Sequence, residues 1–296
     1  MFQQQYKTVP TGLSFEGPKN ATPGKLQGTL QEATFITSIV FQLVTLVVSA
    51  IALAQGGMPQ TLMTIVTLEL VVQCVEIVWY STVGGLYLFN GWSISIAYRY
   101  ADWLITTPIM MTSILLFVLW DADKECDNVL GEGSRVAALV IIIVSDVLML
   151  LVGFAYEAKV EVLMNFFNMF VQPCLRTCVK PDQRNGPPDG MPKWWDSVGL
   201  YLGWIPFAGV FTPLFVVVSS AFTAWGLIST LLTFFAWALY GVVAILGSAG
   251  YWDEEMRNTA YNVLDIFSKN AVGLIVSSVA IGNDFNTTLP PNCTTY

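Results

Sequence analysis

The sequence predicts an all-α membrane protein built as a bundle of seven transmembrane helices. Charged residues make up only 11% of the chain and hydrophobic residues 54%, whereas a soluble domain has roughly 25% charged residues. Several apolar stretches also reach the length of about 20 residues that a helix needs to cross a bilayer. We therefore expect an integral, multi-pass protein of the plasma membrane or another cellular membrane.

The apolar stretches give the helices in order along the chain. Helices are predicted at about 33–54, 59–80, 95–120, 136–156 and 258–281, and the segment 194–247 is long enough for two more, joined by a tight turn near 220–224. A stretch of about a dozen residues at 159–171 is short for a span, so we interpret it as an interfacial or loop helix. The predicted regions are a polar N-terminal segment at 1–32, the membrane domain at 33–281 with a long connection at about 157–193, and a polar tail at 282–296.

Composition excludes several kinds of chemistry. The chain has no histidine, which removes the commonest general base and metal ligand. Its five cysteines have no paired spacing that indicates a disulfide framework or a zinc site, so no metal site is expected. No dense basic run offers a footprint for nucleic acid. Proton chemistry must therefore use carboxylates, lysine, tyrosine, hydroxyls or water.

Lys269 is the clearest ionisable residue inside an apolar helix. A charge at the bilayer centre costs about 2.5–3.5 kcal/mol on insertion scales, so it needs a partner. Asp265 precedes Lys269 by four residues and lies on the same face of the helix. This pair could be a structural ion pair or part of a functional site, and its spacing alone does not decide between them.

The helix predicted at 95–120 has a second set of polar residues. Arg99 lies three residues before Asp102 and Thr106 four residues after it, so the three side chains share a face and form a polar column. Ser113 follows farther along the same helix. A lysine amine elsewhere in the bundle could meet this column, although helix geometry alone does not prove that it does.

Four stretches of the sequence resemble the microbial (type 1) rhodopsin family. The most specific is the run Arg-Tyr-Ala-Asp-Trp-Leu-Ile-Thr-Thr-Pro at 99–108, and the second is Asp-x-x-x-Lys, ending at Lys269. The run Trp-Ala-Leu-Tyr at 237–240 is similar to the family's Trp-x-x-Tyr-Pro, except that Gly241 replaces the proline. The fourth stretch consists of Asp146, Met149 and Gly153.

The resemblance implies that Lys269 holds all-trans retinal as a Schiff base inside the bundle. Asp102 and Asp265 are then the counterions, because a buried cation keeps its proton in a low dielectric only beside an opposite charge. Arg99 offsets the second carboxylate. Light isomerises the retinal in this family and changes the relative proton affinity of the Schiff base and Asp102, so Asp102 is the expected proton acceptor.

Aromatic side chains are expected to pack along the retinal, since a long apolar ligand needs flat, rigid walls. The family pattern places these residues at the pocket: Trp103, Thr107, Asp146, Met149, Gly153, Trp204, Trp237 and Tyr240. Family members often have a further tryptophan where this chain has Ala244. That end of the pocket is therefore expected to be roomier.

The resemblance implies light-driven ion transport rather than enzymatic catalysis, and the residues Asp102, Thr106 and Ser113 favour an outward proton pump. In proton-pumping relatives, an acid three turns beyond the acceptor returns a proton to the Schiff base. Ser113 occupies this place, about 16 Å along the helix from Asp102, so the proton must return through water or another group. Chloride and sodium pumps are disfavoured, because Asp102 fills the place of a halide and the helix lacks the amide and glutamine of sodium pumps.

A light-gated cation channel is the main alternative, and a photosensory rhodopsin is the next. Glu69, Gln73, Glu76 and Tyr80 form one polar stripe on an apolar helix, similar to the glutamate-rich second helix of algal channelrhodopsins. Such a stripe is more often a satisfied network between helices than a pore. A transporter or scaffold without retinal is a further alternative. The expected partners are membrane lipid and protons, and further copies of the chain in a homo-oligomer.

The placement of basic residues conflicts with the orientation that the resemblance implies. With the N-terminus outside and the C-terminus in the cytoplasm, most lysines and arginines of the loops and tails lie outside, against the positive-inside tendency. Either the segment 159–193 is threaded differently or the chain is inserted the other way. The sequons at Asn286 and Asn292 would be available for glycosylation only in the inverted case. We retain the family orientation as the expectation.

Overall fold

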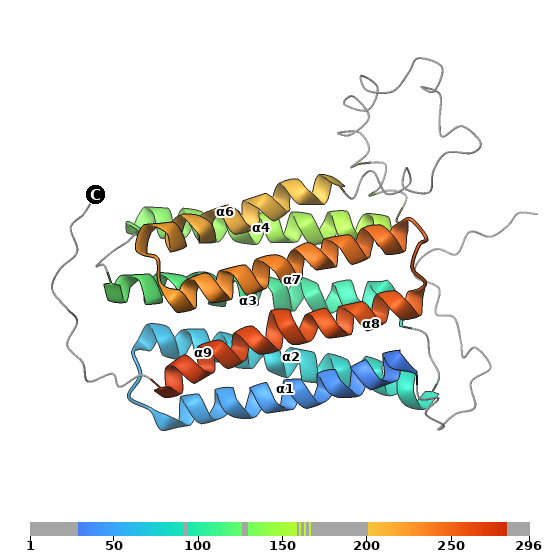
Figure 1. The fold of residues 1–296 in the computed structure, drawn as a ribbon, viewed down its shortest axis with the longest axis horizontal. Helices are drawn as coiled ribbons and strands as arrows, with labels where there is room; N and C mark the ends of the chain where they lie inside the picture. The colour runs from blue at the N-terminus through green and yellow to red at the C-terminus, as the bar shows by residue number, and fades with distance from the viewer. Residues whose placement is uncertain are drawn as a thin grey trace, which may run out of the picture.

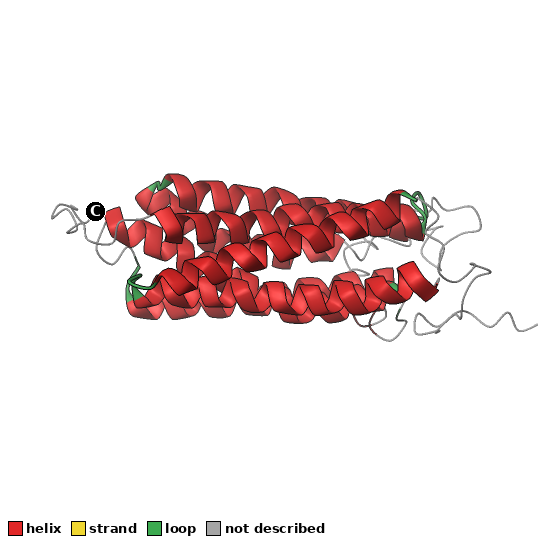
Figure 2. Ribbon diagram, turned by 90° about the horizontal axis from the view of Figure 1, so that it is seen from below, coloured by secondary structure: helices red, strands yellow, loops and turns green. Residues whose placement is uncertain are grey.

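The computed structural model describes residues 29–90, 94–125, 130–158, 160, 163, 166 and 201–282. Seven spans in this part of the chain are long and apolar enough to cross a membrane, and they lie side by side in one bundle (Figures 1 and 2). Their helices are α1 (Leu30–Gln55), α2 (Gln60–Asn90), α3 (Ile96–Glu125), α4 (Glu132–Glu157), α6 (Trp204–Ala221), α7 (Ala224–Ser248) and, in the last span, α8 (Glu254–Asp265), η3 (Ile266–Asn270) and α9 (Ala271–Gly282). The predicted seven-helix membrane fold is confirmed.

Helix α1 is polar on its inner face and apolar on its outer face. On α1, Ser38, Gln42, Thr45 and Ser49 recur every three or four residues and are all buried, whereas Val47 on another face is 55% exposed. A helix on the surface of a soluble protein has the reverse pattern, with its apolar stripe toward the core. The exposed apolar side chains therefore face lipid, and the polar groups gather in the interior.

Local sequence explains where several helices begin and end. Thr29 and Glu32 form a capping box at the start of α1, and the Asp253 side chain accepts a hydrogen bond from the Met256 N–H at the start of α8. These caps add a polar first turn, so both helices begin three or four residues before the predicted starts. Phe222 has a left-handed backbone with φ of 42° and forms the tight turn predicted near 220–224.

The helix α2 continues to Asn90, ten residues past its predicted end. Gly84 does not break this helix but lies where α1 approaches, because a Cβ atom at Gly84 would be 2.9 Å from the ring of Phe35. Most of the predicted connection at 157–193, including most of the segment 159–171, lies outside the described residues, as do almost all of the N-terminal segment and of the tail.

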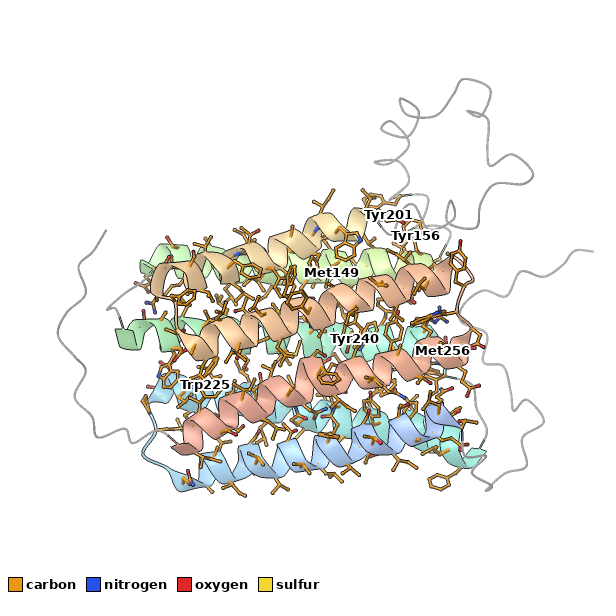
Figure 3. The ribbon with its side chains drawn as sticks, in the orientation of Figure 1. Met149, Tyr156, Tyr201, Trp225, Tyr240 and Met256 are labelled. Atoms are coloured by element: carbon orange, nitrogen blue, oxygen red, sulfur yellow. The ribbon has the colours of Figure 1, made fainter. Side chains whose placement is uncertain are left out.

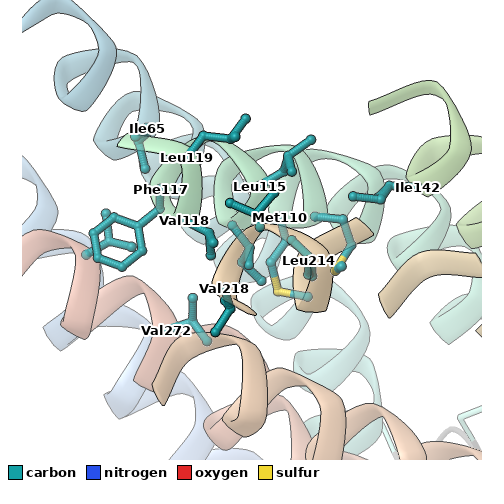
Figure 4. Close-up of a cluster of buried hydrophobic side chains, with 14 of the residues drawn as sticks. Ile65, Met110, Leu115, Phe117, Val118, Leu119, Ile142, Leu214, Val218 and Val272 are labelled. Atoms are coloured by element: carbon teal, nitrogen blue, oxygen red, sulfur yellow. The ribbon is translucent and has the colours of Figure 1, made fainter. Parts of the chain in front are cut away.

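A large cluster of buried apolar side chains joins all seven spans. It includes residues of α2, α3, α6 and α9, among them Ile65, Phe117, Leu214 and Val272 (Figure 4). Close packing of this kind resists small displacements. The cluster therefore fixes α3 and the last span against each other, and these two spans provide the central groups of the site described next.

Candidate functional site around Lys269

Lys269 lies in the interior, and its amine meets carboxylates from three different helical segments. Its Nζ atom donates to Asp102 Oδ2 of α3 at 3.1 Å and to Glu76 Oε1 of α2, and lies 3.4 Å from Asp265 Oδ1 of α8. The Lys269 side chain is only 2% exposed. The structure thus brings the predicted lysine and both predicted counterions together, and it adds Glu76.

The helix that holds Lys269 is not a regular α-helix at this point. Residues Ile266–Asn270 form a π-helical segment, in which the Ala271 N–H donates to the carbonyl oxygen of Ile266, five residues earlier. Single π turns inside α-helices are rare and frequently occur at functional sites. This local change alters the direction of the Lys269 side chain relative to the α-helical residues on either side.

Arg99 is the second buried cation, and its guanidinium lies close to Asp265. Its Nε donates to Asn258 Oδ1 at 2.7 Å and its Nη2 donates to Asn262 Oδ1 at 2.6 Å. Its Nη1 lies 3.6 Å from Asp265 Oδ2. These contacts attach α3 to the last span, and they direct the guanidinium toward Asp265, as the resemblance to the family implied.

The two aspartates differ in how many donors they meet. Asp265 accepts hydrogen bonds from the hydroxyl groups of Tyr80 at 2.6 Å and Tyr240 at 2.5 Å, in addition to its pairing with Arg99. Asp102 Oδ2 faces Lys269, whereas its Oδ1 has no hydrogen-bond partner among the described residues. Asp265 is therefore held by several donors, while Asp102 keeps one oxygen available.

The cluster contains more acids than bases. Two cations, Lys269 and Arg99, meet three carboxylates, Glu76, Asp102 and Asp265, so two positive and three negative charges give −1 when every group is ionised. All five residues are 5% exposed or less. An unpaired charge in such a place is costly, so the cluster is balanced only when it holds one further positive charge.

An apolar cavity adjoins the Lys269 amine between α3, α4, α6 and α7. Figure 3 shows two of its residues, Met149 on α4 and Tyr240 on α7, within the bundle. Seven of the predicted pocket residues line it: Trp103, Thr107, Met149, Gly153, Trp204, Trp237 and Tyr240. Tyr100, Phe207 and Tyr261, for which the sequence suggested no role, line it as well.

Two glycines allow aromatic side chains to approach the cavity closely. A Cβ atom at Gly153 would collide with the hydroxyl of Tyr100, and a Cβ atom at Gly241 would lie 3.3 Å from the ring of Trp204. Gly241 is the residue that departs from the proline of the family pattern. The Trp204 ring therefore lies close against α7 at this position.

The predicted threonines connect the site to its surroundings. Thr107 Oγ1 donates to Asp146 Oδ2 at 2.9 Å, so Asp146 supports the wall through Thr107 and is not itself among the lining residues. Thr106 Oγ1 donates to the main-chain oxygen of Asp102 at 3.1 Å, rather than to the Asp102 carboxylate. Thr107 therefore links α3 to α4, whereas the Thr106 hydrogen bond lies within α3.

The polar stripe on α2 contributes contacts to the site that the sequence did not predict. Glu76 touches Lys269, Tyr80 touches Asp265, and Glu69 Oε1 accepts a hydrogen bond from Ser113 at 2.5 Å. The spacing of the stripe correctly indicated one buried polar face. It carried no information about which helix would face it, and only the packing of α2 against α3 and the last span supplies the partners.

Comparison with known proteins assigns the family. The sequence profile of bacteriorhodopsin-like proteins matches residues 29–175 and 194–283, and the chain belongs to this family. The fold matches that of the viral rhodopsin OLPVRII with a TM-score of 0.60 and 23% identity, covering 86% of this chain and 98% of that one. No curated protein sequence matches the chain.

Two further solved structures share this fold. Halorhodopsin, a light-driven chloride pump, matches with a TM-score of 0.59 and 17% identity over 86% of this chain and 97% of its own. The blue light-absorbing proteorhodopsin from Med12 matches with a TM-score of 0.59 and 19% identity over 86% of this chain and 98% of its own. At these identities the similarity shows the fold.

Retinal is the cofactor that the family implies, and the residues fit it. Covalent attachment of an aldehyde requires a primary amine, which Lys269 places at the wall of a cavity lined mainly by aromatic and aliphatic side chains. A cationic nitrogen there requires an acceptor, and Asp102 provides a carboxylate at 3.1 Å. The site therefore has both the shape and the charge that retinal would need.

Proposed function

We propose that this protein is a light-driven outward proton pump, in which Lys269 holds retinal and Asp102 accepts a proton from the Lys269 nitrogen. The family supports light-driven ion transport as the general activity. Retinal supplies the absorption of light and a change of shape when it is bound. The remaining steps depend on the residues that surround the Lys269 nitrogen.

One observation carries the assignment of the acceptor. Asp102 Oδ2 lies 3.1 Å from the Lys269 nitrogen, and its Oδ1 has no partner among the described residues. Asp265 lies 3.4 Å from the same nitrogen, but it already accepts hydrogen bonds from two tyrosine hydroxyls and faces Arg99. Those donors favour a lasting carboxylate. Of the two predicted counterions, Asp102 is therefore the one with room for a proton, and Asp265 keeps a negative charge in the site.

The acceptor side determines the direction of transport. Asp102, Arg99 and Asn258 follow one another toward the end of the bundle where α3 and α8 begin. The family orientation places this end outside the cell, so a proton on Asp102 leaves outward. Antibody labelling of a tag fused at Tyr296 tests this orientation. Labelling of permeabilised cells alone supports it, whereas labelling of intact cells would show that the chain is inserted the other way and that the proposed direction of transport is wrong.

A light-gated cation channel is the second candidate, and a row of polar groups between α1 and its neighbours favours it. Gln42 Nε2 donates to Glu76 Oε2 at 3.4 Å, and Ser49 and Ser277 are hydrogen-bonded at 2.8 Å. A halide pump is disfavoured, because Asp102 already provides the negative charge beside Lys269.

Two measurements test the proposal in sequence. Adding all-trans retinal to purified apoprotein should give a visible absorption band that hydroxylamine bleaches, and Lys269→Ala should remain colourless. Light should then drive current at zero driving force under voltage clamp. A current that reverses with the cation gradient would establish the channel instead, and a colourless wild-type protein would remove retinal from the account.

A further inference from the structure

Glu69 is a buried acid that the proposed transport step does not use. Its exposed fraction is 0%, and among the described residues its hydrogen-bond partner is the Ser113 hydroxyl, which donates to Glu69 Oε1 at 2.5 Å. The other carboxyl oxygen, Oε2, has no partner there. A charged carboxylate with one neutral partner is unfavourable in the interior. Glu69 therefore has the surroundings of an acid that holds a proton at rest.

The position of Glu69 relative to Lys269 follows from the last span. Gly273 lies four residues beyond Lys269, about one helical turn or 6 Å along the axis. A Cβ atom at Gly273 would lie 3.2 Å from Glu69 Oε2 and 3.3 Å from Gln73 Nε2. Glu69 is thus about one turn from the Lys269 backbone, toward the end of the bundle where α9 ends. The Lys269 nitrogen contacts Glu76, seven residues after Glu69 on α2, so it lies about two turns or 10 Å from Glu69 along the axis. Asp102 and Arg99 lie on the opposite side of Lys269.

Polar side chains occupy the interval between Glu69 and Lys269. Gln73 follows Glu69 by one turn on α2, and Asn270 follows Lys269 directly. Both amides are buried, and none of their side-chain nitrogen and oxygen atoms has a hydrogen-bond partner among the described residues. Buried polar groups that lack a protein partner are normally satisfied by ordered water. Water bound to these amides would complete a path for a proton.

We propose that Glu69 is the internal proton donor that returns a proton to the Lys269 nitrogen after Asp102 has taken the first one. The O–H bond of the Glu69 carboxyl group breaks, a new N–H bond forms at Lys269, and Glu69 is left as a carboxylate. A proton from the aqueous phase at that end of the bundle then restores the Glu69 acid. Ser113 positions Glu69 through its hydrogen bond, so the serine needs no acidity of its own.

This inference rests on the proposed proton pump and deepens it. Infrared difference spectra and flash-induced absorbance changes of the retinal-loaded protein test it together. Wild-type protein should show a carboxylic C=O band that changes on illumination, and Glu69→Gln should lack that band. In Glu69→Gln, return of the proton to Lys269 should slow by about 100-fold. The slowed rate should fall about tenfold for each unit rise in pH, since hydronium ions from the aqueous phase then supply the proton.

Added azide, a small diffusible acid and base, should restore the rate in Glu69→Gln. Asp123→Asn is the matched control, because Asp123 is a carboxylate on α3 that is 28% exposed and pairs with Arg135. It should leave both the C=O band and the rate unchanged. Ser113→Ala should shift the frequency of the C=O band, because the hydrogen bond to Glu69 is lost.

The outcomes separate this inference from the function on which it rests. A wild-type protein that transports protons, combined with an unchanged return rate in Glu69→Gln, overturns Glu69 as the donor and leaves the pump intact. A wild-type protein whose Lys269 nitrogen keeps its proton in the light overturns the pump itself. If Glu69→Gln does not fold, Glu69→Asp replaces it as the test variant. The shorter acid should shift the C=O band and slow the return of the proton to Lys269. A wild-type band together with a wild-type return rate would contradict the proposal.

Discussion

Replacement of Asp102 by asparagine is the most direct test of the charge arrangement around Lys269. Asp102 Oδ2 and the Lys269 nitrogen are 3.1 Å apart, and at an effective dielectric constant of about 20 their attraction is about 5 kcal/mol. Asp265, at 3.4 Å, contributes an attraction of nearly the same size. Asp102→Asn therefore removes a large part of the stabilisation of the cationic nitrogen but leaves two carboxylates, Asp265 and Glu76, beside it.

We expect Asp102→Asn to remain coloured and to absorb at longer wavelength. In the wild-type protein, the attraction to Asp102 stabilises the ground state, in which the positive charge is concentrated at the nitrogen, more than it stabilises the excited state. A loss of a few kcal/mol lowers the transition energy enough to move the band by tens of nanometres. Proton transport should cease, because an amide cannot accept the proton.

Absorption spectra of purified protein and light-induced pH changes in cell suspensions, with and without a protonophore, measure these effects. Asp123→Asn, at the partly exposed pair with Arg135, is the control and should alter neither. An unchanged absorption band together with unchanged transport in Asp102→Asn would refute both the acceptor and the charge argument.

Three further variants test the packing and the charge balance of the site. Asp265→Asn deprives Arg99 of its buried carboxylate, so the midpoint of thermal bleaching should fall by the equivalent of about 3–5 kcal/mol; an unchanged midpoint would contradict the pairing. Glu76→Gln brings the formal charge of the cluster from −1 to zero, so the midpoint of thermal bleaching should stay equal to that of the wild type or rise. A fall as large as that of Asp265→Asn would contradict the argument from charge balance. Gly153→Ala places a Cβ atom against the Tyr100 hydroxyl. We expect this variant to lower the free energy of unfolding by about 1–3 kcal/mol and to slow the uptake of retinal. Uptake at the wild-type rate would show that Tyr100 moves aside to accommodate the added methyl group.

The sequence predicts the number and nature of the spans well, because lipid imposes a simple length and composition on each of them. The boundaries were less accurate where polar residues belong to a helix. Asp253 and the turn that follows it are polar, yet they form the first turn of α8 because a cap satisfies its N–H groups. Likewise, Gly84 marks a close approach of two helices rather than an end of α2.

The candidate site was predictable where one helix carries the information. Arg99 and Asp102 share a face of α3, and the spacing of Asp265 and Lys269 is local as well. The partners supplied by α2 were not predictable, since spacing along α2 says nothing about its rotation against α3. The π turn at Lys269 gave no signal either: the hydrogen bond from Ala271 to Ile266 depends on packing around the last span and not on a residue type.

The same polar stripe on α2 distinguishes the pump from the channel when its contacts are considered. A conducting pore must offer a continuous path wide enough for a partly hydrated cation, whereas a proton needs only neighbouring donors and acceptors. Several polar groups of α2 are hydrogen-bonded to neighbouring helices, as in the contacts of Glu69 with Ser113 and of Glu76 with Lys269. Opening a pore along this face would break such hydrogen bonds, each worth about 0.5–1.5 kcal/mol net and more for charged partners. Transfer of a proton along the same groups exchanges hydrogen bonds without separating the helices, so these contacts favour the pump.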